Sequence, residues 1–143
     1  MESSISTVAA GREPFRVETD SNSYIVDALH RLLEKYRVNG LMHITGGSFT
    51  KLKDILGTSD ALLFHTKKLK PQKIFYELYE KGVPDAVMYS TFNCGIGFVI
   101  SASPKDAQKI VSHVKNTDII GEVVRGSGKV IIASAFSENL VAL

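Results

Sequence analysis

Two short stretches of this chain combine hydroxyl, imidazole and amide side chains with pairs of glycines. The first, HITGGS, covers residues 43–48, and the second, TFNCGIG, covers residues 91–97. Glycine lets the backbone adopt positive φ angles and lets a ligand approach the main chain closely. Both stretches are therefore candidate sites for binding an anion, and the elements around them determine how they are positioned.

The first stretch follows an apolar run, residues 41–44, that predicts a short buried strand. Because side chains alternate along a strand, His43 and Thr45 are expected on one face and Ile44 on the other. A helix is expected to begin near Ser48, which would place its N–H groups and positive dipole end beside the imidazole. This combination predicts an anion site. A capped turn with a partly buried histidine is the alternative that the same sequence allows. No Gly-Lys-Ser/Thr follows, so the stretch is not a Walker loop.

In the second stretch, Thr91 and Asn93 come just before two glycines at the head of a predicted strand over residues 95–101. Gly95 and Gly97 indicate close approach of either a ligand or another backbone segment. The stretch has neither the third glycine nor the distant acidic residue of a dinucleotide-binding fold.

Other reactive residues give weaker signals. Cys94, the single cysteine, has no neighbouring base and is expected to be a small packed residue. The four histidines are scattered without metal-site spacing, so no metal site is predicted, and His65 at the end of a strand remains ambiguous.

Composition narrows the class of protein. A net charge of +2 on 143 residues does not suggest nucleic-acid binding, and no apolar run is long enough for a membrane helix. One cysteine allows no internal disulfide, and residues 1–10 lack the features of a signal peptide, so we expect a cytoplasmic protein.

The periodicity predicts an α+β domain with a mixed sheet covered by helices. Residues 1–20 are expected to be irregular, 21–134 to form the domain, and 135–143 to be a tail. Ser21 or Ser23 is the candidate N-cap of a first helix, a third helix opens at Pro71, and SPKDAQ begins a fourth, with Ser103 as its N-cap. Ile74 is expected on the core face of the third helix. The runs 118–124 and 129–133 are expected to form a hairpin around a four-residue glycine loop, which excludes an all-parallel sheet.

The order HITGG-F, then MY-TFN-G-G about 45 residues later, resembles the C-terminal domain of phosphoribosylformylglycinamidine cyclo-ligase, also called aminoimidazole ribonucleotide synthetase. The resemblance covers roughly residues 24–133. Relatives of that family make thiamine phosphate, selenophosphate and a hydrogenase cofactor, and the run TFNCGIGF favours the purine enzyme.

The resemblance implies a ligase of purine biosynthesis. ATP would phosphorylate the amide oxygen of formylglycinamidine ribonucleotide, a nitrogen would close the imidazole ring, and phosphate would leave. The site would lie in a cleft against an N-terminal ATP-binding domain. Carried over by position, His43 and Asn93 are the candidate catalytic residues. The candidate substrate- or phosphate-binding residues are Thr45, Gly46, Gly47, Ser48, Thr91, Phe92, Gly95 and Gly97.

The chain departs from the family pattern in three respects. Ser48 stands where the family usually has a third glycine, and Ser90 where it commonly has an arginine. The ATP-binding domain, which would hold ATP and magnesium, has no counterpart here. We therefore expect a chain that is inactive alone and needs an ATP-binding half, and that self-associates through apolar surface left exposed. The alternative is a non-catalytic domain that binds a ligand or partner.

Overall fold

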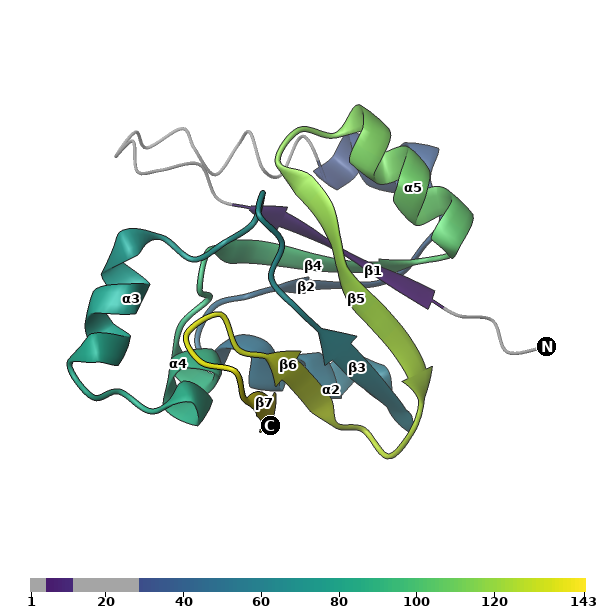
Figure 1. The fold of residues 1–143 in the computed structure, drawn as a ribbon. Coiled ribbons are helices and arrows are strands. Elements are labelled where there is room, and N and C mark those ends of the chain that lie inside the picture. The colour runs from purple at the N-terminus through teal and green to yellow at the C-terminus, as the bar shows by residue number, and fades with distance from the viewer. Residues whose placement is uncertain (1–4, 12–28) are drawn as a thin grey trace.

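The computed structural model describes residues 5–11 and 29–143, and seven strands in this part of the chain form one mixed sheet (Figure 1). The strand order is β2-β4-β1-β5-β3-β6-β7, and every neighbouring pair is antiparallel except β3 and β6, which run parallel. The α+β class with a mixed sheet is thereby confirmed. The strands are β1 (Ile5–Gly11), β2 (Val38–His43), β3 (Ser59–Leu63), β4 (Ile96–Ala102), β5 (Thr117–Arg125), β6 (Val130–Ala133) and β7 (Leu140–Ala142).

Short helices connect these strands. They are the 3-10 helix η1 (Ser48–Leu52), followed by α2 (Lys53–Leu56), α3 (Lys73–Glu80), α4 (Asp85–Thr91) and α5 (Pro104–His113), and residues 29–35 are also helical. The start of α5 is as predicted, since the Ser103 hydroxyl accepts a hydrogen bond from the Asp106 N–H at 3.2 Å. The predicted caps Ser21 and Ser23 lie outside the described residues.

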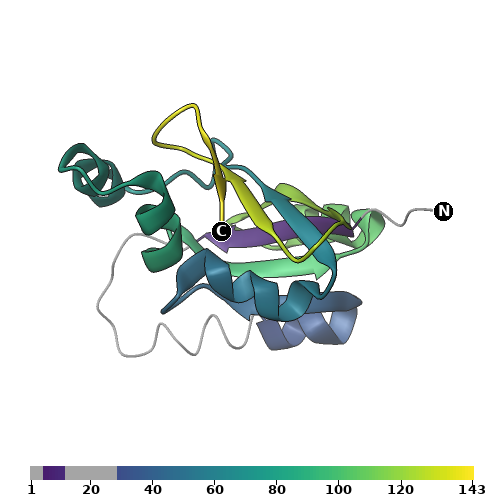
Figure 2. The same ribbon diagram turned by 90° about the horizontal axis from the view of Figure 1, so that it is seen from below.

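Two hydrophobic clusters hold the helices on the sheet. In one, Leu32 and Tyr36 pack with Ile110 of α5, and Figure 1 shows α5 beside the helical residues 29–35. The larger cluster brings η1 and α4 together with the sheet, with Phe49 and Tyr89 almost fully buried. Figure 2 shows α3 and α4 projecting from one end of the molecule. The end of the sheet that carries the two polar motifs therefore rests on the larger cluster.

The prediction that residues 1–20 are irregular is wrong for residues 5–11, which form β1 in the middle of the sheet between β4 and β5. Its sequence, ISTVAAG, contains two large apolar residues and no sustained alternation. The strand is defined by backbone pairing with distant partners, a non-local feature that periodicity does not report. The remainder of 1–20 lies outside the described residues.

The predicted hairpin between residues 118–124 and 129–133 is also wrong. β3 lies between β5 and β6, so the two runs do not pair with each other. The loop between them crosses the start of β3, where the Ser127 and Lys129 N–H groups each donate to Asp60 Oδ1 at 2.8 Å. The glycines of the loop correctly indicated a turn. They do not indicate whether the two strands that the loop joins are neighbours in the sheet or are separated by another strand.

Two smaller corrections concern the ends of elements. The predicted tail 135–143 contains β7, which pairs with β6. The third helix begins at Lys73 with Gln72 as N-cap, two residues after Pro71. Ile74 on that helix is 54% exposed, so its predicted place in the core is wrong, because α3 packs on α4 at the margin of the domain.

Candidate functional site

The first motif begins where β2 ends. Ile44 is buried and its N–H donates to the Gly97 carbonyl of β4 at 2.9 Å, whereas His43 and Thr45 on either side of it are exposed. The alternation predicted from the strand period is confirmed. The His43 ring stacks on the Phe98 ring, with centroids 4.4 Å apart and planes 12° from parallel. This stacking holds the imidazole against β4, close to the second motif.

The glycine turn leads into a weaker element than the sequence suggested. Gly46 and Gly47 are exposed, Gly47 has a φ of +81°, and Ser48 also has a positive φ. The helix expected at Ser48 is the five-residue 3-10 helix η1, followed by the four residues of α2. The Ser48 N–H is already bonded to the Thr45 carbonyl at 2.6 Å. The predicted role of a helix dipole at this turn is therefore wrong, because neither element is long enough to supply one.

Lys51 supplies the positive charge that the helix does not. Its ammonium nitrogen lies 3.1 Å from the Thr45 hydroxyl oxygen, and its side chain passes over Gly47. Sequence reasoning missed this residue. Its signal was a lysine four residues after the glycine pair, which brings the side chain back over the preceding turn.

The second motif joins α4 to β4. Thr91 at the end of α4 is exposed, while Phe92 and Asn93 are half-buried. The Asn93 side-chain oxygen accepts the Gly95 N–H at 3.0 Å, so the carboxamide closes its own turn. Among the residues that the structure describes, the Asn93 amide nitrogen has no hydrogen-bond partner. That nitrogen is the group Asn93 can offer to a ligand.

Gly95 resolves one of the alternatives left by the sequence. Its φ is +90°, and an added Cβ atom would lie 2.9 Å from the Lys70 carbonyl oxygen and 3.3 Å from the Pro71 Cα atom. The close neighbour is thus another backbone segment, the loop after β3. Only a residue without a side chain fits this contact.

The two motifs come together at one end of the sheet. The Ser48 hydroxyl donates to the Phe92 carbonyl, and Ile44 pairs with Gly97 as described above. Figure 1 shows the end of β2 and the connection from α4 to β4 at this same end. We call the exposed and half-buried residues of the two motifs the motif surface; it comprises His43, Thr45, Gly46, Gly47, Thr91, Phe92 and Asn93.

Three other predicted site residues lie beneath the motif surface. Ser48, Gly95 and Gly97 are buried, and the Ser48 hydroxyl is occupied by Phe92. In this arrangement they position the exposed groups and present no side chain of their own. Ser90 lies nearby on α4, where its hydroxyl is 3.4 Å from the Val87 carbonyl.

A partly buried hydrogen-bond chain lies behind the motif surface. His65 Nδ1 lies 3.2 Å from the Leu69 carbonyl, so this nitrogen carries the proton and Nε2 accepts from the Tyr89 hydroxyl at 3.0 Å. The same hydroxyl accepts the Ala135 N–H at 2.8 Å. Burial lowers the pKa of His65 and raises that of Tyr89, which favours the neutral form of both. His65, left ambiguous by the sequence, is thereby placed in a structural role.

Cys94 is a packed residue, as predicted. It is fully buried, and burial raises the pKa of its thiol to about 12. A thiol with that pKa stays protonated near neutral pH and is a poor nucleophile.

The motif surface offers hydroxyls and an imidazole, and the neighbouring Lys51 adds an ammonium, so these groups are suited to phosphate. Carboxylates, which Mg²⁺ prefers, are not among these residues. In the described part of the chain, no three His, Cys, Asp or Glu side chains gather in a way that could hold a metal ion. The residues present therefore fit a phosphate group and do not fit a magnesium ion.

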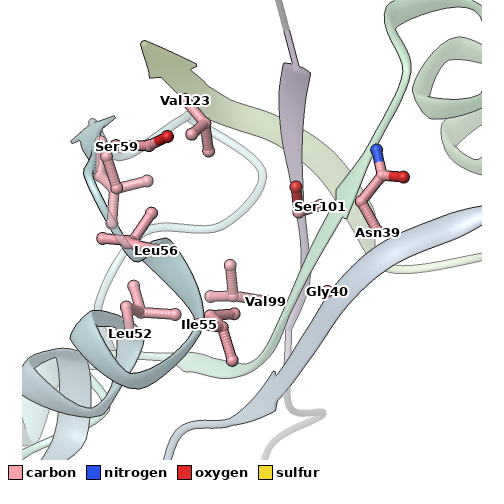
Figure 3. Close-up of a pocket in the computed structure, with 11 residues that line it drawn as sticks. Asn39, Gly40, Leu52, Ile55, Leu56, Ser59, Val99, Ser101 and Val123 are labelled. Atoms are coloured by element: carbon pink, nitrogen blue, oxygen red, sulfur yellow. The ribbon is translucent and has the colours of Figure 1, made fainter. Parts of the chain in front are cut away.

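A separate hollow of about 120 Å³ lies between α2 and the sheet (Figure 3). None of the residues around it is ionisable, and none belongs to the motif surface, so it provides no acid–base chemistry for that surface. Its lining comprises Asn39, Gly40, Leu52, Ile55, Leu56, Ser59, Ala61, Leu63, Val99, Ser101 and Val123.

No helix within residues 5–11 or 29–143 is long and apolar enough to cross a membrane.

Comparison with known proteins places this arrangement among related domains. Residues 8–134 match the family described as AIR synthase related protein, C-terminal domain. The phosphoribosylformylglycinamidine cyclo-ligase of Methanocaldococcus jannaschii is 36% identical over 126 residues, which are 86% of this chain and 34% of that protein. The chloroplastic enzyme of the same name from Arabidopsis thaliana is 38% identical over 68% of this chain and 26% of its own length. The chain thus spans about a third or less of these relatives.

Solved structures share the fold at low sequence identity. The hydrogenase maturation protein HypE in complex with ATP gives a TM-score of 0.66 at 13% identity, covering 100% of this chain and 50% of that one. The T. maritima PurL complexed with ATP gives 0.63 at 14% identity, covering 100% and 25%. At such identities the likeness concerns the fold alone.

Proposed function

Because the chain belongs to the AIR synthase related family, through its C-terminal domain, we propose that it forms the substrate-side half of an ATP-dependent cyclo-ligase. Its reaction would close the imidazole ring of aminoimidazole ribonucleotide. The observation that supports this most directly is that two stretches about 45 residues apart in sequence meet at one end of the sheet, joined by the Ser48–Phe92 and Ile44–Gly97 hydrogen bonds.

In the proposed reaction, ATP phosphorylates the amide oxygen of the substrate, a nitrogen attacks the activated carbon, and phosphate leaves. This chain contributes the wall that binds and orients the substrate. His43, held on Phe98, and the Asn93 amide nitrogen are the groups we expect to contact substrate or phosphate. Thr45 and Thr91 add hydroxyls, and Gly46 and Gly47 leave room for a ligand to reach the backbone.

ATP and magnesium would bind to a separate half. The described residues lack a carboxylate cluster for the metal, and the chain spans at most about a third of the cyclo-ligases it resembles. The partner we propose is therefore an ATP-binding half, on another chain or on a further part of the same protein.

Reconstitution tests this function. The chain is mixed with the ATP-binding half of the M. jannaschii cyclo-ligase, and ADP and imidazole product are measured with and without formylglycinamidine ribonucleotide. We expect substrate-dependent ATP hydrolysis, and we expect His43→Ala to lower it at least about 100-fold, as for loss of a group that acts in the reaction. His113→Ala is the matched control, because His113 is an exposed histidine on α5. A folded, associated pair without substrate-dependent hydrolysis would overturn the proposal.

A non-catalytic binding or interaction domain is the second candidate. It is favoured by the buried Ser48, whose positive φ and hydroxyl bond close the turn inward. Calorimetry with the substrate and with ATP separates the two functions. Substrate binding without turnover in the reconstituted pair would favour the second candidate. Tight ATP binding by this chain alone would contradict the assignment of the ATP site to a separate half.

Self-association is a further expectation. Large apolar side chains are more than 40% exposed on α3, α4 and β7, including Ile74, Val87 and Leu140. Such surface favours association when a partner is absent. Sedimentation of the chain alone should therefore show a mass that rises with protein concentration; a strict monomer would contradict this.

A further inference from the structure

We propose that Lys51 holds the 5′-phosphate of the ribonucleotide, and this inference rests on the proposed function because it places that substrate on the motif surface. Lys51 was not among the residues carried over from the sequence motifs.

The position of Lys51 is set by η1. One turn of 3-10 helix brings the lysine back over the glycine pair, where a Cβ atom on Gly47 would lie 3.3 Å from Lys51 Cγ. At the tip of the side chain, the ammonium nitrogen lies 3.1 Å from Thr45 Oγ1. The ammonium is thus fixed at the exposed end of the first motif, and Lys51 is half-buried where the neighbouring Lys53 is exposed.

No carboxylate neutralises this ammonium within the described residues. The two ion pairs found there join Lys73 to Glu77 and Lys109 to Asp106, on other helices. A lysine ammonium has three N–H donors, of which Thr45 occupies one. Because Thr45 Oγ1 accepts from Lys51, its own proton is directed elsewhere and can serve as another donor.

These groups match a phosphate monoester better than a triphosphate. One ammonium and one hydroxyl beside two exposed glycines can neutralise and hydrogen-bond a single dianionic phosphate. ATP would bring more negative charge together with Mg²⁺, and the motif surface has no carboxylate to hold that ion. The ligand chemistry is therefore the terminal phosphate of a ribonucleotide.

Titration of the chain alone with ribose 5-phosphate tests this inference, with amide NMR shifts as the readout. Lys51→Met keeps the aliphatic stem over Gly47 and removes the charge, and Lys53→Met is the matched control two residues away. We expect saturable shifts at Thr45, Gly46 and Gly47. We expect Lys51→Met to weaken binding by roughly tenfold to a hundredfold, the cost of a charge-assisted hydrogen bond, and Lys53→Met to leave it within about twofold.

Ribose, inorganic phosphate and ATP complete the titration. Ribose should not bind, and inorganic phosphate should bind in the same place with the same dependence on Lys51. Binding of inorganic phosphate without ribose 5-phosphate would overturn the inference in favour of a site for released phosphate, and Lys51-dependent binding that is tighter for ATP would assign the lysine to the nucleotide.

Equal affinities of Lys51→Met and the unmodified chain would also overturn the inference, as would an absence of shifts at about 10 mM ribose 5-phosphate. A thermal melt of each variant identifies a Lys51→Met chain that fails to fold; Thr45→Val, which removes the hydroxyl alone, then replaces it in the titration and is expected to weaken binding as well. These measurements need no ATP-binding half. A failed reconstitution would exclude the cyclo-ligase function and leave the phosphate site standing. Ribose 5-phosphate binding that Lys51→Met leaves unchanged would exclude the phosphate site and leave the cyclo-ligase function standing.

Discussion

The Thr45–Ser48 turn and the Arg125–Lys129 loop each contain two glycines, but the structure uses their backbone differently. In the loop, the Ser127 and Lys129 N–H groups both bond to Asp60, a carboxylate of the same chain. In the turn, the glycines are exposed and the Lys51 ammonium donates to the Thr45 hydroxyl. A glycine-rich segment therefore indicates a ligand site only where the chain itself does not already satisfy its donors.

The comparison also separates the two faces of the motif region. Its outward face carries the groups proposed to bind substrate, and its inner face consists of tightly fitted residues such as Gly95 and Tyr89. Substitutions on the inner face should reduce stability, and those on the outward face should reduce binding.

Gly95→Ala should destabilise the chain by about 2–4 kcal/mol, because the residue has a left-handed φ and its new Cβ atom would meet the Lys70 carbonyl. Gly46→Ala is the matched substitution on the outward face. Nothing lies within 4 Å of its added Cβ atom, so we expect a change within about 0.5 kcal/mol. Urea unfolding measures both, and similar losses for the two variants would contradict the division.

Tyr89→Phe should cost about 1–3 kcal/mol, because it leaves the partly buried Ala135 N–H and His65 Nε2 without partners. Tyr76→Phe is a suitable control, since Tyr76 is half-buried on α3 and its hydroxyl has no hydrogen bond within the described residues. Equal unfolding free energies for the two variants would show that the Tyr89 hydrogen bonds contribute little to stability.

Stability should also depend on pH through His65. Burial lowers the pKa of His65 in the folded chain below the ordinary value of about 6.5 that it has when unfolded. As the pH falls below that value, the unfolded chain binds a proton that the folded chain resists, so the free energy of unfolding decreases. Unfolding measured between about pH 7.5 and 5.5 should show this decrease, and His65→Gln should flatten it. An unchanged slope in the variant would assign the effect to other groups.

Asp60→Ala should give the smallest of these losses, because solvent competes for the loop that Asp60 binds. The N–H groups of Lys129 and Ser127 lower the pKa of Asp60, so its contribution should be present above its unfolded pKa and disappear as the pH falls through the folded value. Asp60→Asn keeps an acceptor oxygen in place of Oδ1 and should lose less than alanine. Thermal melts near pH 7 and in acid test this order, and an alanine variant as stable as the asparagine variant would contradict it.

Much of the local structure was predictable from short-range patterns. The Ser103 cap, the burial of Cys94 and the alternation of His43, Ile44 and Thr45 follow from residue type and spacing over a few positions. The pairing of the two motifs was indicated by resemblance, and the structure adds the contacts that join them. These features depend on the chemistry of neighbouring residues, which the sequence displays directly.

Other features depended on which distant segments meet. The sequence by itself indicated that the runs 118–124 and 129–133 are extended, but the placement of β3 between β5 and β6 came from pairing across more than 50 residues. β1 became a central strand through two neighbours far along the chain. Likewise, only the tertiary structure turned Ser48 inward to Phe92 and brought Lys51 over the glycine turn. Periodicity encodes which way a side chain faces, whereas the choice of partner is a property of the whole packed sheet.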